Sequence, residues 1–281
     1  MVKILDGRER SKEIRSELSK QVAKLREKGI VPTIALIHVG DLGGAANYVK
    51  RKAEACLGIG AEAKVITLSE QTEQSALHET IRSLNEDPKV HGILIQLPLP
   101  KNINEQKAID QIAVEKDVDG ITSSSLGLLL AGRECFVSAG ALAALDLAKQ
   151  SSFKFDGNTI HILGDSVILG RPFAALSLNL GAKVRLHPKD LASVPSCVSE
   201  ADLLLVDVAK PKLIKSVHIK PGAVIIDAGN NYLEGKVVGD VDFDDMLKRA
   251  SAITPVPGGL GPMLITMLLS NLVKAAKQLN S

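Results

Sequence analysis

The chain has 281 residues, of which 45% are hydrophobic, with 34 basic and 32 acidic side chains and a net charge of +2 at pH 7. A chain this long and this apolar can bury a large core, which excludes a disordered protein and favours two domains. Aromatic residues make up only 2%, and no basic block could follow a phosphate backbone, so we expect no nucleic acid partner. The absence of an apolar run of roughly eighteen residues and of a signal-like start predicts a cytoplasmic protein with no membrane partner.

Helical and strand-like patterns alternate along the first half of the chain. Helices are predicted over residues 8–28, 45–57 and 71–85, and strands over residues 32–39, 63–68 and 90–96. Such alternation is typical of parallel βαβ units with helices on both faces of the sheet. The expected fold class is therefore α/β.

A second series of strands and helices follows a change of pattern near residues 124–136. Helices are predicted over residues 139–149, 171–180 and 262–279, and strands over residues 159–163, 183–186, 203–208 and 223–227. Ligands in open α/β sheets gather at the carboxyl ends of strands. The residues just after each strand are therefore the first candidates for a functional site.

The cysteines and histidines give no sign of a metal site. Cys56, Cys135 and Cys197 are far apart and lack Cys-x-x-Cys spacing, so buried small hydrophobic roles are expected for them. None of the six histidines pairs with another at metal-ligand spacing. His38 and His161 lie inside apolar strand-like runs and are predicted to be core residues with satisfied hydrogen bonds.

Tyr48 is the only aromatic residue in the first 135 positions. On the predicted helix it stands one turn from Lys52, with about 6 Å between the Cβ atoms, so a stacking face and an ammonium would project together. The alternative is a plain helix surface with a half-buried tyrosine and a solvated lysine.

Three loops could carry chemistry. Gln96 ends a buried strand and is followed by two prolines in residues 97–100, which is also the pattern of a simple strand-terminating turn. Residues 116–120 place two carboxylates near a glycine, a pattern that most often means a solvated turn. Residues 254–262 hold three glycines, which suggests close approach to a ligand or to another segment.

Residues 164–172 read Gly-Asp-Ser-Val-Ile-Leu-Gly-Arg-Pro between a strand and a helix, where dinucleotide loops lie. The segment lacks the Gly-x-Gly-x-x-Gly pattern, and any tight strand-to-helix turn can require two glycines. Ser166 and the amides of the helix that begins near Arg171 would offer an anion site.

Together these segments resemble the bifunctional methylenetetrahydrofolate dehydrogenase/methenyltetrahydrofolate cyclohydrolase family, known as FolD, over essentially the whole chain. The matching pieces, in order, are Val39-Gly-Asp, Tyr48-x-x-x-Lys52, Gln96-Leu-Pro-Leu-Pro, Lys116-Asp-Val-Asp-Gly, Gly164-x-Ser-x-x-x-Gly-Arg-Pro, Lys220-Pro-Gly-Ala-Val-Ile-Ile-Asp, Gly239-Asp-Val-Asp-Phe and Thr254-Pro-Val-Pro-Gly-Gly-x-Gly-Pro-Met. The resemblance implies oxidation of 5,10-methylenetetrahydrofolate to the methenyl form and its hydrolysis to 10-formyltetrahydrofolate.

The resemblance also implies the roles of the folate-side residues. Tyr48 would pack against the folate, Lys52 would be the catalytic group oriented by Gln96, and Asp119 would hydrogen-bond the pterin. Further substrate contacts are implied for Leu97, Pro257, Gly258 and Gly259. The expected partners are tetrahydrofolate derivatives and a second copy of the chain.

On the cofactor side the implied NADP or NAD contacts are Gly164, Asp165, Ser166, Gly170, Arg171, Pro172, His187, Pro188 and Ala209. Several positions depart from the family. Asp165 replaces an arginine and Pro188 a serine at the 2′-phosphate site, and Asp207 and Leu264 differ near the nicotinamide. We therefore expect NAD, or no cofactor, over NADP. The alternative to an enzyme with both activities is a cyclohydrolase alone or a non-catalytic folate-binding subunit.

The resemblance implies two domains with a cleft between them. The catalytic folate domain is expected over residues 1–142 plus 262–281, and a Rossmann-like NAD(P)-binding domain over residues 143–261.

Overall fold

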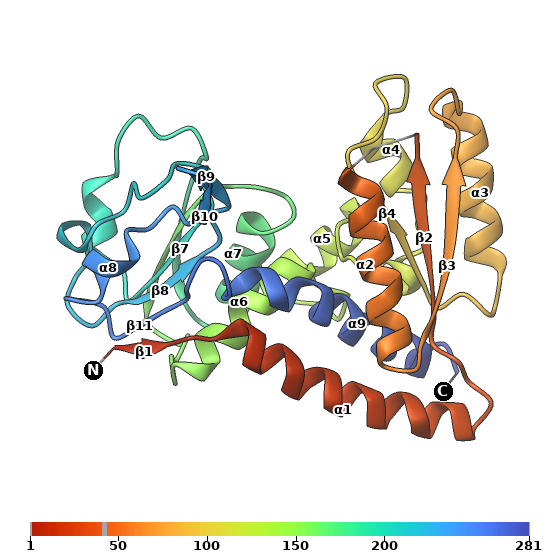
Figure 1. Ribbon diagram of the computed structural model, residues 1–281, viewed down its shortest axis with the longest axis horizontal. Helices are drawn as coiled ribbons and strands as arrows, with labels where there is room; N and C mark the ends of the chain where they lie inside the picture. The colour runs from red at the N-terminus through yellow and green to blue at the C-terminus, as the bar shows by residue number, and fades with distance from the viewer. Residues whose placement is uncertain (1, 41–43, 281) are drawn as a thin grey trace. The chain divides into compact units, whose positions relative to one another are not determined.

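The computed structural model describes residues 2–40 and 44–280, in two compact units (Figure 1). One unit contains residues 13–138 and 265–281, and the other contains residues 1–12 and 139–264. Both are built from parallel strands alternating with helices, so the predicted α/β class is confirmed. No helix in the described ranges has the length and apolar character needed to cross a membrane.

The unit of residues 13–138 is built on a three-stranded parallel sheet. Its strands are β2 (Thr33–Val39), β3 (Glu62–Leu68) and β4 (Gly92–Ile95), in the order β3-β2-β4. Since the chain passes from β2 to β3 on one side and returns to β4 on the other, the strand order reverses between β2 and β4. The carboxyl ends of these two strands are where an open sheet binds its ligands.

Helices cover both faces of this sheet. Ala35, Ile37 and Val39 alternate along β2 and pack in a buried cluster with residues of α3 (Gln74–Glu86) and α4 (Glu105–Ile109). Helix α2 (Gly44–Gly58) lies on the opposite face, beside β3. The short helices η1 (Val114–Lys116) and α5 (Ser123–Leu130) complete this part of the chain.

Two long helices, α1 (Gly7–Glu27) and α9 (Leu260–Gln278), contain two of the three points at which the chain divides into units. The part of α9 that belongs with residues 13–138 contributes Asn271, whose Nδ2 donates to the carbonyl oxygens of Val118 (2.8 Å) and Val137 (2.9 Å). The C-terminal helix is therefore joined to the segment that carries Asp119.

The other unit contains a six-stranded sheet with the order β1-β11-β8-β7-β5-β6 and only parallel pairs. Its strands are β1 (Lys3–Ile4), β5 (Thr159–Leu163), β6 (Lys183–His187), β7 (Leu203–Val206), β8 (Val224–Asp227) and β11 (Ala252–Ile253). The strand order reverses between β5 and β7, which is the position of the dinucleotide crevice in Rossmann-like sheets.

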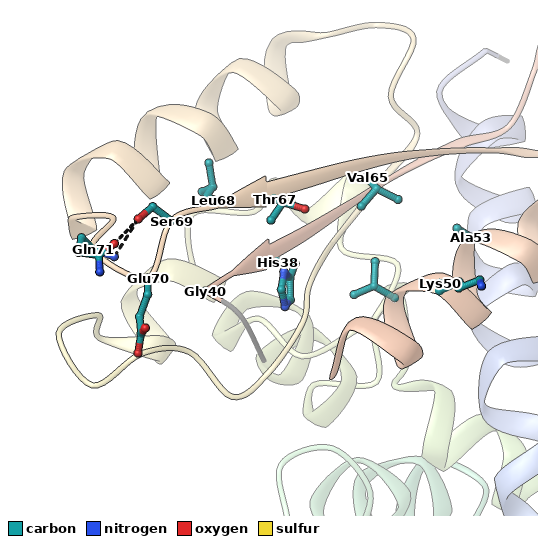
Figure 2. A pocket seen from close by; sticks show the side chains of 11 residues that line it. His38, Gly40, Lys50, Ala53, Val65, Thr67, Leu68, Ser69, Glu70 and Gln71 are labelled. Atoms are coloured by element: carbon teal, nitrogen blue, oxygen red, sulfur yellow. Dashed lines mark hydrogen bonds between the residues drawn. The ribbon is translucent and has the colours of Figure 1, made fainter. Parts of the chain in front are cut away.

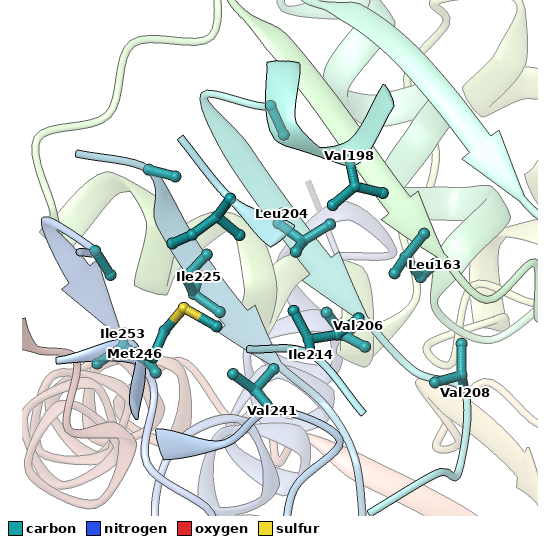
Figure 3. Close-up of a cluster of buried hydrophobic side chains, with 14 of the residues drawn as sticks. Leu163, Val198, Leu204, Val206, Val208, Ile214, Ile225, Val241, Met246 and Ile253 are labelled. Atoms are coloured by element: carbon teal, nitrogen blue, oxygen red, sulfur yellow. The ribbon is translucent and has the colours of Figure 1, made fainter. Parts of the chain in front are cut away.

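One face of this sheet is covered by α6 (Ala139–Gln150) and α7 (Gly170–Asn179). The other face packs a buried cluster that includes Val198 of η2 (Ser196–Glu200), Ile219 after η3 (Ser216–His218) and Met246 of α8 (Phe243–Met246) (Figure 3). The short η2 is thus fixed over β5 and β7 by its buried valine.

The first residues of the chain belong with the six-stranded sheet, which differs from the expected domain boundary. Lys3 pairs with Ala252, and the Leu5 amide donates to the carbonyl of Ile253 at 2.8 Å. The sequence patterns also missed β1, β11 and the antiparallel hairpin β9 (Asn231–Leu233) and β10 (Lys236–Val238), because two or three residues carry no readable periodicity.

Candidate functional site

Lys52 and Gln96 are brought together by α2 and the end of β4. The Nζ of Lys52 donates to the Oε1 of Gln96 at 3.0 Å, and the Nε2 of Gln96 donates to the Leu97 carbonyl at 2.8 Å. The backbone amide of Gln96 continues the sheet by donating to Ile37 at 2.8 Å. Both ends of the glutamine amide are thereby fixed, and Lys52 is held at the carboxyl edge where the strand order reverses.

Asp119 is the third group of this arrangement. Burial lowers the pKa of Lys52 below its ordinary value, and the negative charge of Asp119 opposes that shift. Burial raises the pKa of Asp119, the charge of Lys52 opposes the rise, and Asp117 adds to it. Lys52 is therefore easier to deprotonate than a surface lysine, which suits it to accept a proton.

Tyr48 lies one turn before Lys52 on α2 and is 56% exposed. A ring exposed to this degree contributes little to the core of its unit. Its surface is free to stack on a planar ligand beside the lysine.

The segment around Asp119 is not the solvated turn that its charges suggested. Lys116 is buried, and its Nζ donates to the carbonyl oxygens of Leu84 (3.0 Å), Asn85 (2.7 Å) and Asp87 (2.8 Å). Asp117 is fully buried and accepts hydrogen bonds from the amides of Gly120 (3.0 Å), Ile121 (3.3 Å) and Thr122 (3.0 Å). Lys116 and Asp117 thus stabilise the turn through their hydrogen bonds to backbone groups. Asp119 has no part in those hydrogen bonds.

A cavity of about 780 Å³ is lined by residues of α2, β2 and β3 (Figure 2). Its wall includes His38, Val65 and Thr67, whose side chains extend from β2 and β3 toward α2. His38 is buried as predicted, but its Nε2 has no hydrogen-bond partner among the described residues. The expectation that this ring is fully satisfied is therefore wrong.

In the other unit, Gly164 and Gly170 are required by packing. A Cβ on Gly164, whose φ is +112°, would lie 2.2 Å from the Asp207 carbonyl oxygen, and a Cβ on Gly170 would lie 1.9 Å from that of Gly164. Ser166 occupies the turn itself, since its backbone and side-chain oxygens accept from the amides of Arg171 (3.0 Å) and Gly170 (3.4 Å). These two amides and the ring nitrogen of Pro172 therefore offer no free donor to an anion, contrary to the expected helix-terminal anion site.

Asp165 is paired rather than isolated. Arg171 places a guanidinium nitrogen 3.5 Å from the Asp165 carboxylate and donates from Nε to the Asp165 carbonyl at 2.8 Å. The backbone amide of Lys189 donates to the same carboxylate at 3.2 Å, just after exposed Pro188. The expected bare negative charge is thus partly offset by its neighbours.

Asp207 and Ala209 follow β7 at the point where the strand order reverses. Ser166 Oγ donates to Asp207 at 3.3 Å, and burial raises the pKa of this carboxyl while nearby Lys189 opposes the rise. Buried Asp240 accepts from the amides of Val208 (2.7 Å) and Ala209 (3.1 Å), which fixes an exposed alanine with φ +54°. Asp240 is a positioning residue. It lies in the matching segment Gly239-Asp-Val-Asp-Phe, for which the sequence patterns indicated no role.

The glycine-rich loop 257–259 lies in the same unit as the six-stranded sheet. The Gly258 carbonyl accepts from the Gly7 amide at 2.9 Å, and a Cβ on Gly7 would lie 1.8 Å from the Gly259 carbonyl oxygen. A Cβ on Gly259 would lie 2.6 Å from Thr254 Cβ. Of the two explanations offered for these glycines, close packing against another segment accounts for Gly259.

Two histidines that are 26 positions apart are in contact on neighbouring strands of the six-stranded sheet. His187 Nε2 lies 3.3 Å from His161 Nδ1, and the rings stack with their centroids 5.4 Å apart. Cys197 completes a group whose ligand atoms all lie within 4.8 Å of one another. The expectation from linear spacing that no histidines pair at metal-ligand distance is wrong, because strands β5 and β6 bring them together.

Comparison with known proteins finds a family match in each half of the chain. Residues 5–119 match the catalytic domain of the tetrahydrofolate dehydrogenase/cyclohydrolase family, and residues 138–280 match its NAD(P)-binding domain. The chain belongs to this family. The likeness inferred from the motifs is therefore confirmed.

The similarity to individual members of the tetrahydrofolate dehydrogenase/cyclohydrolase family spans nearly the whole chain. The bifunctional protein FolD of Campylobacter hominis is 41% identical over 277 residues, which is 98% of each chain. The crystal structure of bifunctional FolD from Campylobacter jejuni is similar with a TM-score of 0.95 and 41% identity over 99% of each chain. A Trypanosoma brucei FolD structure, complexed with NADP and inhibitor, has a TM-score of 0.90 and 33% identity and covers 99% of this chain and 98% of its own.

Proposed function

We propose that this protein oxidises 5,10-methylenetetrahydrofolate to 5,10-methenyltetrahydrofolate and hydrolyses the product to 10-formyltetrahydrofolate. The observation that carries the proposal is the Lys52–Gln96 hydrogen bond beside Asp119, within a chain that belongs to a family with both activities. Tyr48 supplies a stacking face on the same helix.

In the hydrolytic step, water adds to the methenyl carbon and gives up a proton. Lys52 accepts that proton, because burial favours its neutral form, and Gln96 keeps its Nζ in place through the 3.0 Å hydrogen bond. Asp119 recognises the amidine-like edge of the pterin, which a carboxylate contacts through paired hydrogen bonds. Leu97, Pro257, Gly258 and Gly259 complete the proposed contacts to the substrate.

Replacing Lys52 tests this function. We expect Lys52→Met to abolish cyclohydrolase activity and leave the fold intact, because methionine keeps the apolar stem and removes the group that takes the proton. The decay of methenyltetrahydrofolate absorbance measures the activity. Lys50→Met is the matched control, since Lys50 is an exposed lysine on the same helix. Unchanged hydrolysis in Lys52→Met would remove Lys52 from the mechanism.

The dehydrogenase step is assigned to the unit of residues 1–12 and 139–264. A bound nicotinamide dinucleotide would supply the hydride acceptor, and the carboxyl ends of β5 and β7, between which the strand order reverses, fit it by topology. The residues proposed to hold it are those around this point: Gly164, Asp165, Ser166, Gly170, Arg171, Pro172, His187, Pro188 and Ala209.

We also propose that this site prefers NAD to NADP. Asp165 stands where relatives place an arginine, and Arg171 is already engaged with its carboxylate. Pro188 has no hydroxyl to offer a 2′-phosphate, whereas a carboxylate accepts a hydrogen bond from a free 2′-hydroxyl. An unpaired carboxylate about 5 Å from a phosphate charge would cost roughly 3 kcal/mol at an effective dielectric near 20, and Arg171 offsets part of it.

The preference is measured as the ratio of kcat/KM values for NAD and NADP with methylenetetrahydrofolate. We expect Asp165→Arg combined with Pro188→Ser to move the ratio toward NADP by at least about tenfold, since attraction replaces repulsion. Asp244→Arg, which makes the same charge change at an exposed position of the same unit, should leave the ratio unchanged. Low-micromolar NADP binding by the unaltered protein would contradict the proposal.

A homodimer is proposed from the family resemblance. Sedimentation of the purified protein at micromolar concentration tests it.

A further inference from the structure

The cluster of His161, His187 and Cys197 shares only His187 with the residues assigned a role in the proposed activities, and none with those assigned to bind folate. His161 and Leu163 alternate on one face of β5, and Leu163 is in register with His187 on β6. The two histidines therefore project from the same face of the sheet. Cys197 belongs to η2, which packs on that face through Val198. Three elements thus bring two imidazoles and one thiol together.

The histidine nitrogens have the separation that a tetrahedral metal requires. Metal–nitrogen bonds to histidine are about 2.0 Å long, so two nitrogens at a tetrahedral angle are about 3.3 Å apart. The His187 Nε2 and His161 Nδ1 atoms are 3.3 Å apart. The Cys197 ligand atom lies within 4.8 Å of those of both histidines, and a metal–thiolate bond is about 2.3 Å long.

Histidine rings bind a metal ion through neutral nitrogens. His161 is fully buried, and its Nε2 lacks a hydrogen-bond partner in the described structure. The nearby positive charge of Arg185 is paired with Glu200 at 3.0 Å.

We propose that His161, His187 and Cys197 form a binding site for one divalent transition-metal ion, of which Zn²⁺ fits best. Two imidazoles and a thiolate are ligands that Zn²⁺ prefers over Mg²⁺ or Ca²⁺, and a water molecule would occupy the fourth position. The metal displaces the thiol proton of Cys197 and ties η2 to strands β5 and β6. This site goes beyond the proposed folate activities and does not depend on them.

Cobalt provides the test, because thiolate-bound tetrahedral Co²⁺ absorbs visible light. The full-length protein, freed of metal and kept reduced with a non-thiol reductant, is titrated with Co²⁺ and then with Zn²⁺. We expect one equivalent of Co²⁺ to produce a thiolate-to-metal charge-transfer band together with visible d–d bands. One equivalent of Zn²⁺ should abolish both. Absence of the charge-transfer band would overturn the proposal.

Variants assign the ligands. Cys197→Ser should remove the charge-transfer band, and His187→Asn should weaken Zn²⁺ binding at least about tenfold in competition with a chromophoric chelator. Cys135→Ser is the matched control, because Cys135 is also a free, half-buried cysteine and lies in the other unit. A band that survives Cys197→Ser, or disappears with Cys135→Ser, would contradict the site. Circular dichroism of each variant establishes that it folds.

Discussion

At the residue scale, the charge on one side chain controls the chemistry of another. The pKa of Lys52 is lowered by burial and held up by the charge of Asp119, so the two residues together set the pH at which the lysine can take a proton. Gln96 adds position rather than charge, because its amide is neutral and is anchored at both ends. The three residues act as a unit, and altering one changes the others.

The pH dependence of hydrolysis should reveal this coupling. The rate catalysed by the unaltered protein should rise with pH to a plateau, with an inflection below 10.5, because Lys52 must be neutral and its pKa is lowered from 10.5. Asp119→Asn removes the charge that raises the Lys52 pKa, so the inflection should move to lower pH. Glu115→Gln, an exposed carboxylate in the same segment, should not move it. The rates are corrected for uncatalysed hydrolysis, and an upward shift in Asp119→Asn would contradict the assignment.

Residue types and spacing indicated Tyr48, Lys52 and Gln96 as candidates, and the family resemblance added Asp119. The structure brings Lys52, Gln96 and Asp119 together. Partners across strands could not be found in this way. The His161–His187 contact and the pairing of Asp165 with Arg171 depend on strand register and loop path, which no linear spacing encodes.

At the element scale, buried charges shape the turn that presents Asp119. The sequence Lys116-Asp-Val-Asp-Gly looks polar and surface-like, yet Lys116 and Asp117 are both buried and fully hydrogen-bonded to backbone groups. Hydrophobic periodicity cannot distinguish such a turn from a solvated one, because both read as charged residues around a glycine. The longer helices and strands were predicted within a few residues, since their apolar periods extend over several turns or pleats.

Asp117→Ala should lower the stability of the protein. It would leave the buried amides of Ile121 and Thr122 without acceptors, while the Gly120 amide keeps the backbone carbonyl of residue 117. Each unsatisfied group costs about 1–3 kcal/mol, so we expect a loss of at least ~2 kcal/mol in the free energy of unfolding. Denaturant titration measures this loss. Glu115→Ala should change it by less than about 0.5 kcal/mol, because that side chain is exposed.

Compared with Asp117→Ala, Asp119→Ala should weaken folate binding more and reduce the free energy of unfolding less. Losing one partner of a desolvated charged hydrogen bond typically costs about 2–5 kcal/mol in binding. Equal effects of Asp117→Ala and Asp119→Ala on both quantities would contradict this division of roles.

At the scale of the whole molecule, the chain divides just after its change of pattern, between residues 138 and 139, and also within the two long helices α1 and α9. The first twelve residues add β1 to the edge of the six-stranded sheet, and only then does the chain enter the unit that holds Lys52. The N-terminal strand could not be recognised, since β1 is two exposed residues long and a helix begins only three residues after it ends. Its partner β11 is equally short and is recognised only from its pairing with β1 on one side and β8 on the other.

Leu5 should therefore stabilise the dinucleotide-binding unit, although it lies at the start of the chain. Its side chain is fully buried, and its amide donates to Ile253 at 2.8 Å in the same sheet. We expect Leu5→Ala to reduce the free energy of unfolding by about 2–5 kcal/mol, as large-to-small changes in a core do. The neighbouring Ile4, which is 43% exposed, provides the control, and Ile4→Ala should have a much smaller effect.

Hydrogen exchange should locate the effect of Leu5→Ala. Amide protection should fall first in β8 and β11, which are the strands nearest β1 in the sheet, and less in β2 and β4. Loss of protection confined to β2 and β4 would place the N-terminal segment with the folate unit instead. Equal stability of the Leu5→Ala and Ile4→Ala variants would show that the edge strand contributes nothing beyond its backbone pairing.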